Sequence, residues 1–421
     1  MQSTSQRRAR HLHTFIALTL VGFGSSATYA LLHAQHSTSL PNSRPQPNPG
    51  GYGATFSTQG QVDLSGEYFQ AQGSNGRSCA TCHVPEEAWA ITPATLQRLF
   101  NESAGLHPVF NLLLDGNNTA MPVGSLEQRL AAFSMLLSRG VFRRGGTPRA
   151  NSEWELIAAE DPHGFANLTR LVQWRRAMPT INFPLGSATV NWDGGNTIGT
   201  DQHAGLINQA TRNVIGAQQG APAPPEVIAE IVAFEESLFT AQLIVLGVGR
   251  LDDDGALGGP AALAAMTRRS GPFDLFDAWR GSDNLRRAQI ARGQDLFNSR
   301  GCGGCHDSAN NGTNTNHALF DIGTAAAAVR TPDLPLYTFR NRATGETRQL
   351  TDSGAGNITG KWSDLGKFKT PTIRALAARQ PYFHNGIAGT LEEVVRFYEA
   401  NLGFVFTDAE RADLVAFLNA L

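Results

Sequence analysis

The chain has 421 residues, of which 41% are hydrophobic and 17% are charged. This length and composition are typical of a soluble globular protein with two or three domains. The 34 basic and 36 acidic residues give a formal net charge of −2, which excludes a generally basic nucleic-acid binder and a disordered acidic chain. After residue 35, no apolar stretch of the sequence is long enough to span a membrane.

Residues 1–34 are predicted to be a targeting segment. A basic stretch at 7–13 precedes an apolar stretch at 14–32 that ends among small residues. This order is typical of a secretory signal, and an uncleaved anchor helix is the alternative. In either form, the positive-inside bias sends the rest of the chain out of the cytoplasm. Residues 35–54, rich in Pro, Gly, Ser, Asn and Gln, are predicted to be a flexible linker.

Every cysteine lies in a C-x-x-C-H motif, and the two motifs consist of Cys79, Cys82 and His83, and of Cys302, Cys305 and His306. In such a motif, both thiols add to the vinyl groups of a c-type haem and the adjacent His is the proximal ligand of the iron. No further Cys is left to complete a zinc site. The sequence therefore predicts two covalently bound c-type haems, each inside a small helical unit like cytochrome c.

The sixth ligand of the second haem iron is not a methionine from the sequence that follows, because all methionines precede the second motif. The candidates are His317, His384, Tyr337, Tyr382 and Tyr398, or an open position. Thr390 and Glu393 form a capping-box pattern that predicts the start of a helix. On that helix Tyr398 falls on the apolar face, where periodicity alone also fits an ordinary core tyrosine.

Several motifs resemble those of the bacterial di-haem cytochrome c peroxidase and MauG superfamily. The resemblance covers about residues 60–92 and 175–421. It is carried by K-T-P-T-I-R at 369–374, P-Y-F-H-N-G at 381–386, W-D-G at 192–194, F-E-E-S-L at 234–238 and P-F-D-L-F-D at 272–277. The resemblance implies a mainly α fold with two cytochrome c-like domains packed face to face and loop-rich insertions. Within these motifs, Arg374 and His384 are implied to contact the cofactor.

The motif positions predict how the chain is divided. An N-terminal haem domain would span 55–245 and contain an insertion at 93–174, and a connector at 246–271 would lead to a C-terminal haem domain at 272–421. The insertion has no assigned role. It would cover the first haem or supply a distal ligand, for which the candidates are His107, His163, Met121 and Met135.

The resemblance also implies roles for two aromatic residues. The family places the distal ligand of the second haem fourteen residues after the His of P-Y-F-H, which is Tyr398 here. Ordinary di-haem peroxidases have Met at this position and MauG-like members have Tyr. A phenolate favours ferric iron, so this haem is expected to have a low potential. Trp192, in the W-D-G motif, is implied to conduct electrons or holes between the haems.

One position departs from the family pattern near the first haem. The glutamine and the acid that follow W-D-G in the family correspond to Gln209, which matches, and to Gln219, which is not an acid, and the resemblance implies that both belong to the catalytic site. Gln219 can form hydrogen bonds but cannot exchange a proton at neutral pH. His203 is the alternative acid–base group, although a surface histidine is the simpler interpretation.

The family often binds Ca²⁺ between the haems, through one Asn side chain and two backbone carbonyls. Ala177 stands at the Asn position, and Arg379 and Pro381 stand at the carbonyl positions. The loss of one oxygen ligand weakens a hard-cation site. The sequence therefore leaves Ca²⁺ binding open.

These features together predict a periplasmic di-haem oxidoreductase that reduces hydrogen peroxide or uses it to oxidise a protein partner. The electron donor would be a small cytochrome, a copper protein or a residue of the partner, and membrane contact would occur only through an N-terminal anchor. The alternative is a non-enzymatic di-haem electron-transfer protein, and a third option is haem used only as structure or sensor. A vacant coordination position distinguishes an enzyme from a carrier.

Overall fold

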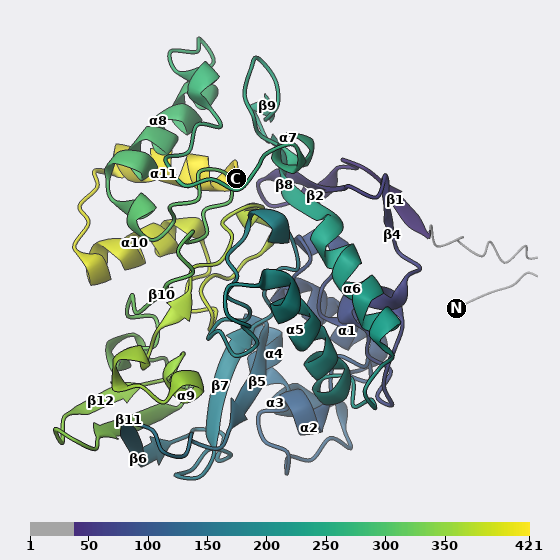
Figure 1. Ribbon diagram of the computed structural model, residues 1–421, viewed down its shortest axis with the longest axis vertical. Coiled ribbons are helices and arrows are strands. Elements are labelled where there is room, and N and C mark those ends of the chain that lie inside the picture. The colour runs from purple at the N-terminus through teal and green to yellow at the C-terminus, as the bar shows by residue number, and fades with distance from the viewer. Residues whose placement is uncertain (1–37) are drawn as a thin grey trace, which may run out of the picture. The chain divides into compact units, whose positions relative to one another are not determined.

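The structure is a computed structural model that describes residues 38–421, shown as a ribbon in Figure 1. The predicted signal or anchor at 1–34 lies outside the described residues. Within the described range, no helix has both the length and the apolar character needed to cross a bilayer. Residues 38–421 form one compact unit, so the boundaries expected between the two haem domains stay a prediction.

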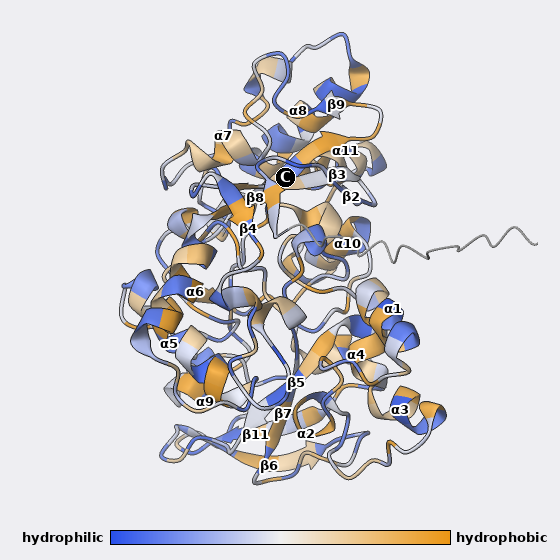
Figure 2. Cartoon of the chain, turned by 90° about the vertical axis from the view of Figure 1, so that its right-hand side faces the viewer, coloured by the Kyte–Doolittle hydropathy of each residue, from blue (hydrophilic) through white to orange (hydrophobic). Residues whose placement is uncertain are grey.

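Eleven α-helices occur in the described part of the chain, and their bounds are α1 (Pro93–Ser103), α2 (Leu112–Asp115), α3 (Leu126–Ala132), α4 (Ser134–Arg139), α5 (Gln202–Gly216), α6 (Pro225–Ser237), α7 (Pro260–Ala264), α8 (Leu285–Ser299), α9 (Gly356–Thr359), α10 (Leu391–Leu402) and α11 (Asp408–Asn419). Many of these helices carry both hydrophilic and hydrophobic segments, as the colours of α5 and α6 in Figure 2 show. An amphipathic helix of this kind buries one face and leaves the other in water.

Thirteen short strands accompany the helices and form five small sheets. The larger sheets are β2 (Gln46–Asn48), β3 (Gly51–Ser57), β8 (Leu238–Val245) and β9 (Gly249–Arg250), and β12 (Thr347–Leu350), β11 (Leu336–Asn341) and β6 (Trp154–Glu160). The two-stranded sheets are β1 (Ser39–Pro41) with β4 (Gln61–Asp63), β5 (Val141–Gly146) with β7 (Leu171–Arg176), and β10 (Leu319–Phe320) with β13 (Phe368–Lys369). The expectation of a mainly α fold therefore omitted a substantial β component, much of it in regions expected to be loops.

The segment predicted as a flexible linker is instead part of a sheet. Strand β3 pairs antiparallel with β8 from Gly51 opposite Val245 to Ser57 opposite Leu238. Gly51 adopts φ +140°, and a Cβ at this position would lie 2.3 Å from the carbonyl oxygen of Ile244. Glycine is thus required at this contact between the strands. Strands β1 and β2 pair with the nearby β4 and β3, and β3 alone ties the segment to a distant part of the chain.

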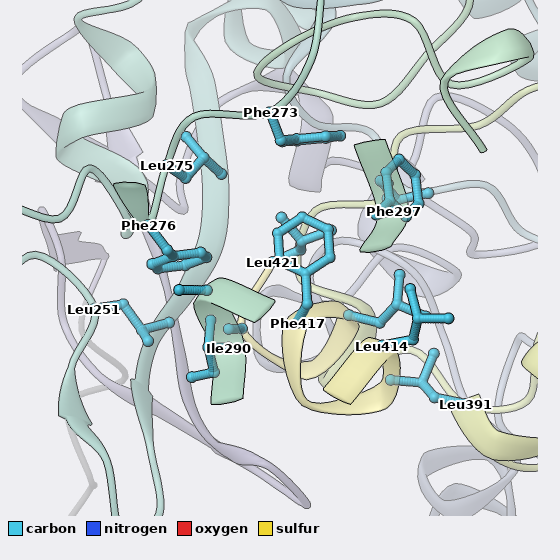
Figure 3. Close-up of a cluster of buried hydrophobic side chains, with 14 of the residues drawn as sticks. Leu251, Phe273, Leu275, Phe276, Ile290, Phe297, Leu391, Leu414, Phe417 and Leu421 are labelled. Atoms are coloured by element: carbon cyan, nitrogen blue, oxygen red, sulfur yellow. The ribbon is translucent and has the colours of Figure 1, made fainter. Parts of the chain in front are cut away.

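The C-terminal part of the chain has its own hydrophobic core between α8, α10 and α11. Figure 3 shows members of this core, including Phe273, Phe276 and Phe417, which meet in edge-on ring contacts. Helices α8 and α11 touch at Gly293, where a Cβ would lie 2.0 Å from the backbone oxygen of Asp413. Helix α11 begins with a complete capping box formed by Thr407 and Glu410.

A second core lies beneath α5 and α6. It contains the aromatic side chains of Tyr68, Phe69, Trp89 and Phe234, whose ring centroids are 4.8–6.2 Å apart. The insertion forms further cores of its own around α1, α4 and the β5–β7 pair. All six residues of β7 are buried, so this strand carries the insertion into the interior, next to the segment that begins the W-D-G motif.

Candidate functional site

The two C-x-x-C-H loops have the same local structure. Each begins with a 3-10 turn, at Cys79–Thr81 and at Cys302–Gly304. In each turn, the backbone N–H of the second cysteine donates to the carbonyl of the first. All four thiols are free of disulfides. The repeated geometry presents two thiols and the following imidazole on one loop, as haem attachment requires.

Both proximal histidines are oriented through the same ring atom. The Nδ1 of His83 lies 2.9 Å from the carbonyl oxygen of Trp89, and the Nδ1 of His306 lies 2.6 Å from that of Gly312. An Nδ1–H that donates to a carbonyl leaves Nε2 with the lone pair that binds a metal. Burial lowers the pKa of both imidazoles, that of His83 to about 4, so each ring is neutral and fit to ligate.

The second loop opens into a largely apolar cavity. Its walls include Cys302, Cys305 and His306 from the loop, and Trp192 and His384 from the family motifs. The predicted apolar face of α10 is confirmed, because each of its members lines this cavity: Leu391, Val394, Val395, Tyr398 and Leu402. The cavity therefore joins the second attachment loop to the helix that carries the candidate distal ligand.

Tyr398 enters this cavity without a polar partner. Its ring contacts Phe383 and Phe397, and no residue between 38 and 421 forms a hydrogen bond with its hydroxyl. Burial raises the pKa of the Tyr398 phenol, and the nearby thiols of Cys302 and Cys305 raise it further. Tyr398 is half-buried on the wall of a largely apolar cavity, so its unpaired hydroxyl is suited to a ligand that binds there.

Three of the other candidates for the sixth ligand are engaged elsewhere. The hydroxyl of Tyr337 donates to the carbonyl of Val172, and that of Tyr382 donates to the carbonyl of Leu376. The Nδ1 of His317 accepts a hydrogen bond from the backbone N–H of Ala188. Of the five sequence candidates, Tyr398 and His384 are thus the two that face the cavity without such a bond.

His384 is held by stacking and not by a hydrogen bond. Its ring lies parallel to that of Phe368, with centroids 3.9 Å apart, and meets Trp192 edge-on at 6.3 Å. Its buried Nε2 has no hydrogen-bond partner and lies 3.8 Å from Asp352. Burial lowers the pKa of His384 to about 4, so the imidazole is neutral despite this carboxylate.

Trp192 is fixed at both its side chain and its backbone. Its Nε1 donates to the carbonyl of Arg176 at 2.9 Å, and its own carbonyl accepts from the N–H of Lys369 at 2.8 Å. The next residue, Asp193, forms an ion pair with Arg175. The W-D-G motif is therefore locked to β7 on one side and to β13 on the other, with the indole on the wall of the cavity.

Four cations of this region have no carboxylate partner among the described residues: Lys369, Arg374, Arg176 and Arg379. Burial lowers the pKa of Lys369 to about 8 and those of Arg374 and Arg176 to about 9. All three guanidinium nitrogens of Arg374 are buried without a hydrogen bond. A buried unpaired cation is strongly unfavourable. Lys369 and Arg374 fit the anionic propionate groups of haem, which would supply the missing countercharge, whereas Arg176 and Arg379 donate to backbone carbonyls.

The residues predicted near the first haem are not brought together. Gln219 is exposed at φ +55°, and its carbonyl, not its side chain, accepts from Ser74. Its neighbour Gln218 is buried, with Nε2 3.9 Å from the Sγ of Cys79. The side chain of Gln219 thus lies in solvent, and its place in the catalytic site stays a prediction. Gln209 is half-buried on α5, and His203 is an exposed residue paired with Glu236.

Sequence reasoning missed one buried acid, Glu235 of α6. Its side chain is 2% exposed, and Oε2 has no hydrogen-bond partner. Burial raises the pKa of Glu235 to about 8, with Glu236 adding to the shift. The carboxyl lies near enough to Cys79 to raise the pKa of that thiol. The available signal was its spacing, because Glu235 follows Ile228, Ile231 and Val232 on the apolar face of α6.

The insertion candidates for a first-haem ligand have other contacts. The Nδ1 of His107 accepts from the N–H of Val109, and the ring of His163 meets Trp174 edge-on. Met135 is buried in a core between β5 and β7. Met121 packs against the same hydrophobic cluster as Cys82 of the first attachment loop.

The residues at the expected Ca²⁺ position do not fit a metal ion. The carbonyl of Arg379 accepts a hydrogen bond of 2.6 Å from the guanidinium of Arg176, and Ala177 supplies no oxygen from its side chain. Within residues 38–421, no cluster of three or more His, Cys, Asp or Glu side chains could hold a metal.

Comparison with known sequences gives cytochrome c peroxidases and a MauG protein among the relatives. No family model matches the chain. It is 32% identical over 171 residues to the cytochrome-c peroxidase IdrP1 of Denitromonas iodatirespirans, covering 35% of this chain and 44% of that protein. It is 28% identical over 262 residues to the methylamine utilization protein MauG of Methylorubrum extorquens, covering 59% and 64%. The chain thus spans less than half the length of the first of these relatives, and both are oxidoreductases.

Among solved structures, a MauG-like protein associated with microbial copper homeostasis is 20% identical, with a TM-score of 0.35 over 59% of this chain and 73% of that one. The sequence relatives support the resemblance to di-haem peroxidases and MauG, and they imply covalently bound c-type haem. A tyrosine at the distal position of the second haem remains a prediction for this chain.

Proposed function

We propose that the protein is an exported di-haem c-type oxidoreductase of the periplasm that reduces hydrogen peroxide or uses it to oxidise a protein partner. The observation that carries this proposal is one cavity lined by both His306, whose Nε2 is free, and Tyr398, whose hydroxyl has no partner. The peroxidase and MauG relatives support peroxide as the oxidant.

A bound c-type haem supplies one-electron redox chemistry and, at an iron with a free position, reaction with peroxide. The chain's own residues provide the rest. The four thiols fix the two groups covalently, and His83 and His306 ligate from the proximal side. Lys369 and Arg374 would neutralise propionates, because Lys369 is a half-buried cation and Arg374 a fully buried one, and neither has a carboxylate partner among the described residues. Tyr398 closes the second site as an anionic oxygen donor.

Trp192 is the electron-transfer residue of this proposal. It lines the cavity of the second haem, and its indole N–H and its carbonyl are each held by a backbone bond. Fixed orientation lowers the reorganisation that accompanies electron transfer through an aromatic ring. The edge-on contact with His384 places a neutral imidazole beside the indole, where it adds no positive charge.

A tyrosine ligand favours oxidation of a protein partner over simple peroxide removal. An anionic oxygen donor stabilises oxidised iron, so the second site would retain oxidising equivalents and would be a poor acceptor for ordinary cytochrome electrons. The exposed Gln219 leaves no acid at the expected position, which also fits slow peroxide turnover. The partner's identity is set by the surface around these sites.

Low-temperature EPR and optical spectra of the haem-loaded protein, before and after one equivalent of hydrogen peroxide, test this function. A high-spin ferric signal that peroxide removes identifies an open, reactive first haem. Tyr398→Phe should change the low-spin signal of the second haem. The matched control is Tyr382→Phe, because Tyr382 lines the same cavity but its hydroxyl is bound to Leu376. Two low-spin haems that are inert to peroxide would instead establish an electron carrier.

A further inference from the structure

We propose that the guanidinium of Arg176 is a built-in cation that takes the place of the Ca²⁺ expected between the haems, so that this protein orders its inter-haem region without a metal ion. The proposal concerns the chain's own residues and does not depend on peroxide chemistry. It assigns to Arg176 a positioning role toward Trp192.

The contacts of the guanidinium resemble those of a hard cation. Nη1 donates to the carbonyl oxygen of Arg379 at 2.6 Å, and Nη2 donates to the carbonyl oxygen of Ile91 at 2.9 Å. Ca²⁺ takes six to eight oxygen ligands, often including backbone carbonyls. One carbonyl at the expected ion position is thus already bound to a positive charge, and that charge comes from the chain itself.

The location of Arg176 matches the expected ion position in sequence and in space. Ala177, where an Asn side chain would have provided an oxygen, directly follows Arg176 in sequence. Arg379 and Pro381, the two carbonyl positions, line the same cavity as Arg176. An ion at this place would lack the Asn oxygen and would meet the guanidinium at Arg379, so its coordination shell could not be completed.

The charge of Arg176 is not cancelled by an ion pair. The side chain is buried, and no carboxylate of the described residues lies within ion-pair distance of it. The titratable groups that face it are Arg379, Glu87 and Tyr382, and Glu87 and Tyr382 partly offset the effects of burial and of Arg379 on its pKa. A buried guanidinium without a partner acts on its surroundings as a monovalent cation would.

The backbone of the same residue connects this cation to the redox residues. The N–H of Arg176 donates to the carbonyl of His384 at 2.7 Å, and the carbonyl of Arg176 accepts from the indole Nε1 of Trp192 at 2.9 Å. The residue that carries the guanidinium thus also holds the Trp192 indole and the backbone of His384. This gives the adjoining insertion a structural role, because β7 begins within it and delivers Arg176 to this point.

The experiment is a calorimetric titration of the EGTA-dialysed holoprotein with Ca²⁺, compared with the double variant Arg176→Ala/Ala177→Asn. The wild type should show no binding up to about 1 mM Ca²⁺, the weak end of protein sites, and its melting temperature should not change with EGTA. The double variant, with the guanidinium removed and an amide oxygen added, should bind one Ca²⁺ and melt higher in its presence. Stoichiometric Ca²⁺ binding by the wild type, or no binding by a folded double variant, would overturn the proposal.

A second comparison covers the case in which the double variant does not fold. Arg176→Lys keeps a cation at this place, whereas Arg176→Met keeps the length of the side chain without charge. The Lys variant should retain the wild-type EPR signals and indole fluorescence of the holoprotein, and the Met variant should alter both. Equal behaviour of the two variants would contradict a role for the charge.

Discussion

The guanidinium of Arg175 binds the carboxylate of Asp352 through two parallel hydrogen bonds of 2.8 Å each. The same guanidinium pairs with Asp193 of the W-D-G motif. All three side chains are buried. Asp352 also lies 3.8 Å from His384. One network of charges thus fixes the insertion strand β7, the tryptophan motif and the segment of Asp352 relative to one another, next to the His384 ring.

Removal of one member of this network should be strongly destabilising. Asp352→Asn would leave Arg175 with one carboxylate in a buried site, and breaking a buried pair in this way costs about 3–5 kcal/mol. Urea unfolding of the holoprotein measures the change. Glu102→Gln is the control, because Glu102 pairs with Arg98 on the surface and exposed pairs contribute only about 0–1 kcal/mol. A similar small loss in both variants would contradict the importance of the network.

The haem content should follow the motifs one by one. Replacement of Cys79 and Cys82 by Ala should reduce the covalently bound haem from two per chain to one, and the same change at Cys302 and Cys305 should do so independently. Pyridine haemochrome spectra and intact-protein mass spectrometry count the groups. A protein that keeps two covalent haems after either change would refute the assignment of that motif.

Because Gln219 is exposed, we expect that an acid at this position does not raise the rate of peroxide consumption. A positioned general acid contributes about 10²–10⁴-fold to a rate, but Gln219→Glu would place its carboxylate in solvent. Peroxide consumption by this variant should stay within about twofold of wild type, well below that contribution. Gln218→Glu, one residue earlier and beside Cys79, is the informative comparison. A large gain from Gln219→Glu would show that this loop turns inward in the working protein.

The sequence was sufficient for features that depend on local spacing. The attachment loops follow from C-x-x-C-H, and the inward face of α10 follows from its apolar period and from the cap at Thr390. The placement of Tyr398 in the cavity needed nothing beyond that helix. These features hold because a 3.6-residue period fixes which side chains share a face, whatever the rest of the chain does.

Features that depend on distant pairing were not predictable in the same way. The segment at 38–54 looks like a linker by composition, yet β3 is held by β8 far along the chain. Two adjacent glutamines follow α5, and only Gln218 is buried, because the chain turns into the left-handed region at Gln219. The helical period does not predict which of two adjacent residues is buried after a helix has ended. Nothing in the sequence around Arg176 indicates a buried guanidinium that binds carbonyls.

The buried Glu235 makes a prediction about pH. Its pKa is about 8 in the folded protein against an ordinary value of 4.5. The neutral carboxyl therefore contributes full stability below pH 4.5, and this contribution is lost progressively as the pH rises through 8. The free energy of unfolding should fall by up to about 5 kcal/mol over this range from this group alone. Glu235→Gln, which cannot ionise, should remove that part of the decline and be more stable than wild type above pH 8.

Urea unfolding at pH 5, 7 and 9 measures this effect as the difference between variant and wild type at each pH. Glu236→Gln is the matched control, since Glu236 is the neighbouring acid on α6 and its partly exposed side chain pairs with His203. Its stability difference should not vary with pH by more than about 0.5 kcal/mol, the usual size of surface effects. A difference for Glu235→Gln that stays constant from pH 5 to 9 would mean that Glu235 is ionised throughout, with a cation or water beside Oε2 that offsets the burial.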